Sequence, residues 1–181
     1  MSAPRVKVLR RTAVYQGRVV RMIREELLVQ GRRMVRESVL HPGAAVIVPA
    51  LDRSRLILVR QYRRSVNRML LELPAGTLER GEPPARCARR ELVEETGWKA
   101  ARLRRIGRFY AAPGFTTEQL TIFLAQGLTR TAMRPDPDEM VRPVILRITD
   151  VLRRIRSGEI CDGKTIIGVL FARRYLRRPG A

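Results

Sequence analysis

Glutamate is concentrated in one short stretch of this chain. Six of the twelve glutamates fall between residues 72 and 95. Three of them, Glu91, Glu94 and Glu95, are spaced i, i+3 and i+4, so in a helix their carboxylates would share one face. The like charges of Glu91 and Glu95 would destabilise an isolated helix, whereas a hard divalent cation such as Mg²⁺ binds carboxylate oxygens. The spacing therefore predicts either a metal site or a solvated acidic helix face.

The rest of the chain is strongly basic. Lys+Arg 37 against Asp+Glu 17 give a formal net charge of +20. Such a charge fits a nucleic acid, an anionic membrane surface or a small phosphorylated substrate. Nearly all of the basic residues are arginines, and they run from Arg5 to Arg178 without a dense basic tail. This distribution is what a composition bias produces, and it makes a nucleic-acid partner unlikely. In so basic a chain, a cluster of acids favours the metal site over the solvated face.

The acidic cluster lies in a strongly marked helix over residues 81–97. Pro83 and Pro84 stand at its first positions, where a missing N–H costs least, and Gly97 stands where a left-handed cap would end it. Arg90 can reach Glu94 at i+4. The expected inward face is narrow and consists of Ala85, Ala88, Leu92 and Thr96.

Several protein classes are excluded by simple features. No stretch approaches the roughly 18 apolar residues of a membrane helix, and the first residues lack the apolar segment of a secretory signal. Cys87 and Cys161 alone cannot build a disulfide framework, which favours the reducing cytoplasm. His41 is the only histidine, so a multi-histidine metal site is excluded. We expect a cytoplasmic protein without a membrane partner.

The remaining elements are predominantly strands before the helix and mixed after it. Short alternating runs over residues 5–40, with turns at 16–17 and 30–31, predict a small antiparallel meander that ends at His41-Pro42-Gly43. Further strands are expected at 44–48 and 56–62, at 106–110 and 120–125 around a Pro113-Gly114 loop, and at 144–146. Helices are expected at 150–157 and 164–176.

Residues 76–98 match a known pattern in full. The stretch GTLERGEPPARCARRELVEETGW resembles the signature of the Nudix hydrolases. In that family, water attacks a nucleoside diphosphate linked to another moiety, assisted by Mg²⁺ or Mn²⁺. The specified positions are Gly76, Glu82, Arg90, Glu91, Leu92, Glu94, Glu95, Gly97 and Trp98.

The resemblance extends over roughly residues 12–175 and points to the ADP-ribose pyrophosphatase branch. It is carried by residues 36–37, 59–63, 71–76, 112–118 and 162–165, with Pro113 about fifteen residues past the signature. The resemblance implies an α/β (α+β) Nudix fold, a mixed sheet between helices. It also implies an N-terminal antiparallel β domain over 1–43, exchanged across a homodimer, and a Nudix domain over 44–181.

The same resemblance assigns roles to individual residues. The Ala75 carbonyl, Glu91, Glu94 and Glu95 would hold the metal, with Glu94 ligating or orienting and Arg90 bracing the carboxylates. Arg63 would bind the diphosphate. Arg36 and Glu37, with Arg18 as a weaker candidate, would contact the adenosine part. Gly114 and Glu118 would shape the ribose end.

The catalytic base of this branch lies on an acidic loop late in the chain. The matching segment is Asp136-Pro137-Asp138-Glu139, and Glu139 is the predicted base. A solvated linker is the alternative. The segment departs from the branch at Arg142-Pro143, where an acidic and a β-branched residue are common, and Pro143 cannot donate to a sheet ladder.

The predicted reaction is metal-dependent hydrolysis of ADP-ribose to AMP and ribose 5-phosphate, with Mg²⁺ or Mn²⁺ as cofactor. Two alternatives stay open. The chain could act on another nucleoside diphosphate sugar, because only the pocket walls would differ. Less favoured is a Nudix-fold RNA-binding or decapping protein, because a binding-only protein has no evident need for three helix carboxylates.

Overall fold

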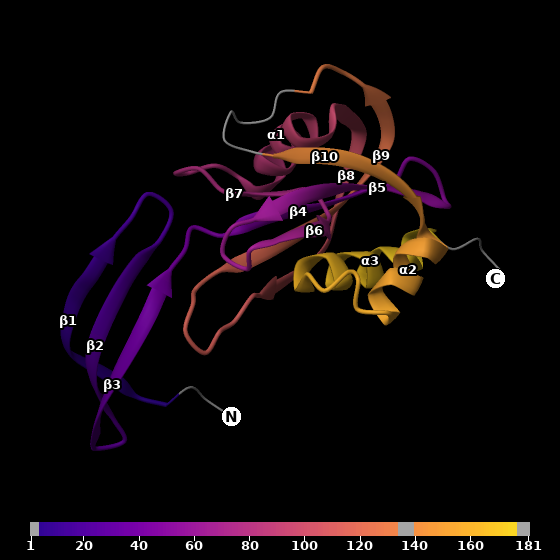
Figure 1. The fold of residues 1–181 in the computed structure, drawn as a ribbon. Coiled ribbons are helices and arrows are strands. Elements are labelled where there is room, and N and C mark those ends of the chain that lie inside the picture. Colours follow the sequence, from indigo (N-terminus) through magenta and orange to yellow (C-terminus); the bar gives the residue numbers. More distant parts are fainter. Residues whose placement is uncertain (1–3, 134–139, 177–181) are drawn as a thin grey trace. The chain divides into compact units, whose positions relative to one another are not determined.

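The computed structural model describes residues 4–133 and 140–176 (Figure 1). The chain divides into two compact units, one of residues 1–43 with 110–119 and one of residues 44–109 with 120–181. Among the described residues, no helix is both long enough and apolar enough to cross a membrane.

The first unit is built on a three-stranded antiparallel sheet in the order β1-β2-β3, formed by Val6–Gln16, Arg21–Val29 and Arg32–Leu40. Val29 pairs with Arg32, and the two residues between them, Gln30 and Gly31, have φ values of 50° and 80°. Positive φ at both central positions is the geometry of a tight two-residue hairpin, which confirms the predicted turn. β1 is exposed along its whole length.

The loop at 110–119 is fastened to the end of β3. The Val39 N–H donates to the Phe115 carbonyl at 2.8 Å, and the Thr117 N–H donates back to the Val39 carbonyl at 3.0 Å. These two backbone bonds hold the loop beside Val39, with which Thr116 forms a parallel bridge.

The second unit contains two sheets and three helices. One sheet has the order β7-β4-β9-β8, from Ala75–Thr77, Ala44–Pro49, Gln119–Arg130 and Trp98–Tyr110, and β4 and β9 run parallel. The other has the order β10-β5-β6, from Val141–Arg147, Arg55–Arg63 and Arg68–Glu72. The helices are α1 (Pro84–Thr96), α2 (Ile148–Arg156) and α3 (Gly163–Leu176).

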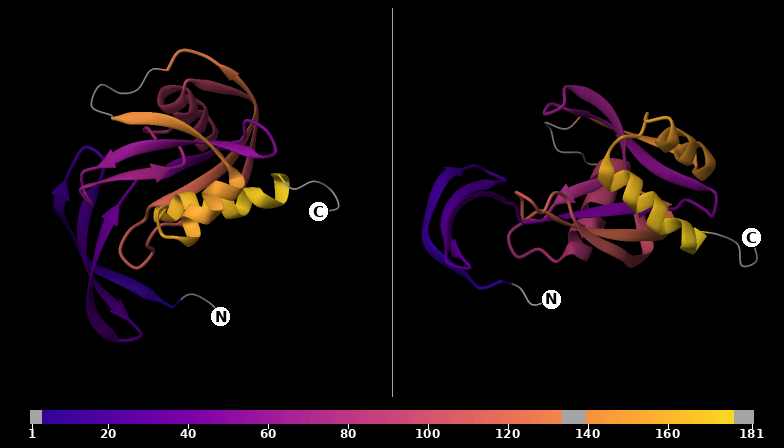
Figure 2. Two further views of the ribbon diagram at one scale, coloured as in Figure 1. Left: turned by 45° about the vertical axis from the view of Figure 1, so that its right-hand side comes forward. Right: turned by 90° about the horizontal axis from the view of Figure 1, so that it is seen from below.

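β4 separates two apolar cores. Its residues alternate, so that Val46 and Val48 join the core that contains α2 and α3, while Ala45 and Ile47 join the core beneath α1. Figures 1 and 2 show α1 on one side of the strands and α2 and α3 on the other. This is the predicted α+β arrangement of a mixed sheet between helices. Each large apolar side chain buried here, such as Leu92 at 0 % exposure, contributes about 1.5–3 kcal/mol.

The structure corrects three details of the sequence analysis. Ala85 is exposed, and the buried stripe of α1 instead takes in Cys87, Glu91 and Glu95, because the backbone of Gly76 in β7 lies against that side of the helix. β8 begins at Trp98, directly after the helix cap, rather than at 106. Pro143 lies inside β10, opposite Val59; a proline is tolerated there because β10 is an edge strand.

Candidate active site

The ends of α1 set the position of its acidic residues. Pro84 begins the helix, and Pro83 before it is the N-cap residue in an extended conformation. Gly97 ends it with φ 69° and ψ 30°, and its N–H donates to the Val93 carbonyl at 2.9 Å. A left-handed residue at this place stops the helix and turns the chain at once into β8.

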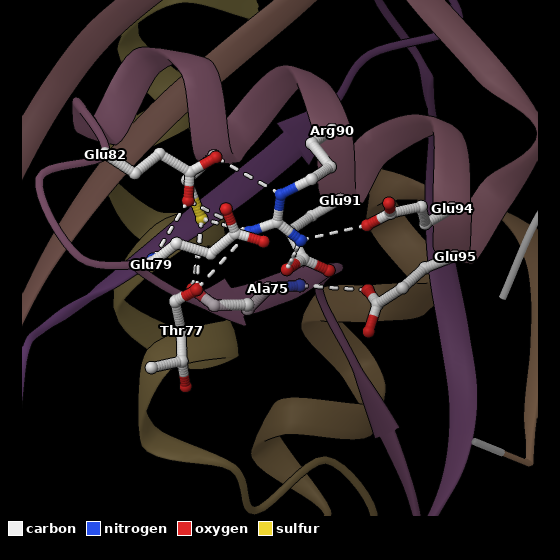
Figure 3. A network of polar contacts seen from close by, with 10 residues as sticks. Ala75, Thr77, Glu79, Glu82, Arg90, Glu91, Glu94 and Glu95 are labelled. Carbon is white, nitrogen blue, oxygen red and sulfur yellow. Dashed lines mark hydrogen bonds and ion pairs between the residues drawn. The ribbon is translucent and has the colours of Figure 1, made fainter. Parts of the chain in front are cut away.

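Arg90 lies at the centre of the acidic cluster (Figure 3). Its Nε and Nη2 donate to the two carboxylate oxygens of Glu82 at 3.2 and 3.0 Å. Its Nη1 donates to Glu91 Oε1 at 2.6 Å and to Glu94 Oε2 at 3.0 Å. One guanidinium therefore gathers three carboxylates from a helix and the turn before it, and the predicted contact from Arg90 to Glu94 is confirmed.

Three glutamates of this site are largely buried, whereas the side chains of Arg90 and Glu94 are each 28 % exposed. The side chains of Glu82 and Glu91 are 4 % and 10 % exposed, and Glu95 is 1 % exposed. The hydrogen bonds from Arg90 hold the pKa of Glu82 below its usual range, and the Glu82 carboxylate in turn raises the pKa of Arg90. A solvated acidic face would expose these side chains, so the burial argues for an organised site.

Residues 75–77 of β7 run along the acidic side of α1. The Ala75 N–H donates to Glu95 Oε2 at 3.0 Å. A Cβ on Gly76 would lie 1.7 Å from Glu91 Oε1, so any side chain here would displace the Glu91 carboxylate from its present position. The glycine of the sequence motif is therefore explained by close approach rather than by a turn.

A second ionic cluster lies at the ends of β5 and β6. Arg63 binds Glu72 with two parallel bonds, Nε to Oε1 at 2.9 Å and Nη2 to Oε2 at 2.7 Å. Lys164, at the start of α3, donates to Glu72 Oε2 and lies 3.1 Å from Asp162 Oδ2. Burial alone would raise the pKa of Glu72, but the bond from Arg63 and the charge of Lys164 outweigh it and keep that pKa low. The charge of Glu95 contributes to raising the pKa of Arg63, so electrostatics couples the two clusters.

The residues present fit a hard divalent cation. The acidic cluster offers a set of oxygen donors, namely the carboxylates of Glu91, Glu94 and Glu95 and the nearby backbone of Ala75, and Mg²⁺ and Mn²⁺ prefer such a set. Because Gly76 has no side chain, its backbone lies directly against the Glu91 carboxylate. Within residues 4–133 and 140–176, no three acidic, thiol or imidazole groups already stand at ligand spacing, and Arg90 lies among the carboxylates instead.

The first unit brings together part of the predicted substrate set. Arg36 and Glu37 line a hollow of about 540 Å³ whose wall includes Phe115, an aromatic ring that is 59 % exposed. Gly114 precedes that ring in the loop and is exposed.

Glu118 lies near His41 rather than at the hollow. His41 Nε2 is 3.9 Å from Glu118 Oε1, and His41 Nδ1 accepts from the Gly43 N–H at 3.0 Å. Arg18 is exposed in the turn between β1 and β2. The predicted base Glu139 lies outside the described residues.

Sequence reasoning gave no role to three residues of these clusters: Glu72, Lys164 and Phe115. Glu72 could have been found as an acid two residues before Pro74 and nine residues after Arg63, on the neighbouring strand. Phe115 carries an ordinary signal, an aromatic residue in a glycine-containing loop. Lys164 had no local signal, because its partner lies 92 residues away.

Comparison with known proteins identifies the family of this α+β domain. The chain belongs to the NUDIX domain family, which it matches over residues 40–165. It is 36 % identical to an ADP-ribose pyrophosphatase of Bacillus subtilis (strain 168) and 34 % identical to a methanol dehydrogenase activator of Bacillus methanolicus; each match covers 91 % of both chains.

Two further comparisons complete the family relationship. A GDP-mannose pyrophosphatase of Citrobacter koseri is 32 % identical, over 69 % of this chain and 70 % of its own. A crystal structure of an ADP compounds hydrolase superposes with a TM-score of 0.85 at 24 % identity, covering 97 % of this chain and 96 % of that one. At this identity the structural match shows the fold.

Proposed function

We propose that this hydrolase cleaves the diphosphate of ADP-ribose, giving AMP and ribose 5-phosphate, with Mg²⁺ or Mn²⁺ as cofactor. The observation that carries the proposal is the row of glutamates on α1, with Glu91 and Glu95 buried, Glu91 and Glu94 bonded to Arg90, and Gly76 packed against Glu91. The 36 % identity to an ADP-ribose pyrophosphatase over 91 % of both chains supports the choice of substrate.

In this proposal Glu91, Glu95 and the Ala75 carbonyl hold the cation, and Glu94 ligates it or orients a ligand. When bound, a divalent cation neutralises charge on the diphosphate and lowers the pKa of water. Arg90 keeps Glu91 and Glu94 gathered before the substrate arrives, because its fixed fork of donors reaches both carboxylates.

Arg63 binds the diphosphate in this proposal. Its bidentate bond to Glu72 fixes the guanidinium plane, and 35 % of the Arg63 side chain stays exposed for a phosphate oxygen. Glu139 takes the proton from the attacking water. In the first unit, Arg36, Glu37 and Arg18 contact the adenosine part, and Gly114 and Glu118 contact the ribose end.

We further propose a cytoplasmic homodimer in which the N-terminal domain, residues 1–43, is exchanged and completes the partner's substrate site. The exposed apolar side chains of β1 support an exchanged strand, because Val6, Val8, Val14 and Tyr15 are each 46–59 % exposed. Nucleic acid and membranes are not part of the proposed function.

The second candidate is hydrolysis of another nucleoside diphosphate sugar. The identity to a GDP-mannose pyrophosphatase favours it, because the same carboxylates would serve both reactions and only the nucleoside and sugar contacts would differ. A substrate panel separates the two candidates.

The panel contains ADP-ribose, ADP-glucose, GDP-mannose, diadenosine polyphosphates and capped RNA, each with and without Mg²⁺, and a coupled phosphatase reports the product. We expect the highest kcat/KM with ADP-ribose and no release without a divalent cation. A higher kcat/KM with GDP-mannose would transfer the proposal to the second candidate, and activity on capped RNA alone would overturn both.

A further inference from the structure

The segment that carries the Ala75 carbonyl is fixed from both of its sides. On the α1 side, the Ala75 N–H binds Glu95. On the other side the segment meets the first turn of α3, whose residues Asp162, Lys164 and Thr165 come from a region some 90 residues further along the chain. Nothing in the proposed chemistry uses this turn.

Thr165 joins the two elements through a single hydroxyl. Thr165 Oγ1 accepts from the Leu73 N–H at 2.8 Å and donates to Asp162 Oδ2 at 2.6 Å. Asp162 also accepts from the Thr165 N–H at 3.1 Å, as an N-cap residue does. Thr165 is 0 % exposed, so without its hydroxyl the Leu73 N–H would be left buried and unpaired.

Two neighbouring contacts reinforce the same junction. A Cβ on Gly168, one turn after Thr165, would lie 2.6 Å from Leu73 Cδ1, so α3 presses directly on the Leu73 side chain. Glycine inside a helix is unfavourable in itself, and close packing explains its presence here. Lys164 forms an ion pair with Glu72, the residue before Leu73, and so holds it in place.

We propose that Thr165, supported by Asp162 and Lys164, is a positioning residue that sets the Ala75 carbonyl for metal binding. The path is short: the hydroxyl fixes Leu73, Pro74 is held by its carbonyl bond from the Ile47 N–H at 2.8 Å, and Ala75 follows. Because Leu73 is anchored, Ala75 is held at the position where its N–H donates to Glu95. This inference rests on the proposed function, because it concerns the same cation.

The test compares Thr165→Val with Thr165→Ser in the full chain. Valine keeps the shape of threonine and loses the hydroxyl, whereas serine keeps the hydroxyl and loses a methyl group. Gly163→Ala is the matched control in the same turn, because a Cβ there meets nothing within 4 Å. Mn²⁺ binding is followed by electron paramagnetic resonance of the free ion, and Tm and kcat are measured alongside.

We expect Thr165→Val to weaken Mn²⁺ binding by about 10–100-fold, the usual cost of losing a residue that orients a metal ligand. Thr165→Ser and Gly163→Ala should bind Mn²⁺ as the wild type does. Mn²⁺ affinity unchanged in Thr165→Val would overturn the inference, as would an equal loss in Thr165→Ser, since that loss would come from packing.

A second variant covers the case in which Thr165→Val does not fold. Lys164→Met removes the ion pair with Glu72 and leaves the Thr165 hydroxyl in place; it should weaken Mn²⁺ binding by a smaller factor, and an unchanged affinity would count against the inference. A wild type that binds no Mn²⁺ overturns the proposed function and this inference together. Normal hydrolysis and normal Mn²⁺ binding in both variants overturn the inference alone.

Discussion

Gly76→Ala adds one methyl group at the closest approach between β7 and α1. Its Cβ would lie 1.7 Å from Glu91 Oε1 and 1.9 Å from Glu91 Cδ, whereas ordinary contact begins at 3.4 Å. The Glu91 carboxylate or the strand must therefore move by roughly 1.7 Å to relieve the overlap. Gly76 is absent from the residues with positive φ, so alanine brings no backbone strain and the effect is purely steric.

The expected magnitude follows from that displacement. Misplacing a catalytic group by about 1 Å costs on the order of 10²-fold in rate, which corresponds to about 2.7 kcal/mol on the activation barrier. Overpacking a buried contact costs about 1–3 kcal/mol of folding stability. In a domain of this size each kcal/mol lowers Tm by about 2–4 °C. We therefore expect kcat at least about 100-fold lower in a protein that is still folded.

The assay is steady-state hydrolysis of ADP-ribose at saturating Mg²⁺, with Tm measured on the same preparations. Gly163→Ala is the control, because it adds the same methyl group where a Cβ has no neighbour within 4 Å, and its kcat should equal that of the wild type. Glu91→Gln, which adds no heavy atom, should reproduce the loss in kcat. Gly76→Ala with near-normal kcat would refute the assignment of Glu91 to the metal site.

Three further predictions concern the acids and their arginine. Glu95→Gln removes the charge that would bind the cation, so it should abolish turnover. Its amide oxygen can still accept from the Ala75 N–H, so Tm should be kept; near-normal activity would contradict the role of Glu95 as a ligand. Glu139→Gln should lower kcat strongly with little change in KM, and an unchanged kcat would place the base elsewhere. Arg90 holds the pKa of Glu82 low, so their pairing stabilises the fold above the unfolded-state pKa of Glu82 and is lost as the pH falls through the folded-state value. Arg90→Met should therefore lower stability by about 1–3 kcal/mol at pH 7. The difference in Tm between this variant and the wild type should narrow below pH 4.5, the ordinary pKa of Glu82. A difference that stays constant with pH would contradict the pairing.

Sequence reasoning located α1 well because the signals that define it are local. The prolines at its start and Gly97 at its end act through the conformation of single residues, and the structure shows both caps. The i, i+4 spacing likewise predicted the contact of Arg90 with Glu94. The buried face was misjudged at Ala85, because periodicity shows which residues share a face and does not show what packs against it.

The boundaries of the strands were less predictable for a similar reason. The apolar run predicted a strand only over residues 144–146, and Pro143 just before it has no N–H to donate. The strand nevertheless begins at Val141, because β10 has a neighbour on one side only. Whether a strand is at the edge of a sheet depends on the order of all its strands, which no local pattern records.

The sequence by itself determined the acidic cluster and the family of the chain, because both depend on residue types at fixed spacing within one short stretch. Only the tertiary structure showed that Arg63 is paired with Glu72 and that Lys164 and Thr165 reach the segment before Ala75. These contacts join residues up to 92 positions apart. Their energies depend on burial and hydrogen-bond geometry, which arise when β6 and α3 pack together.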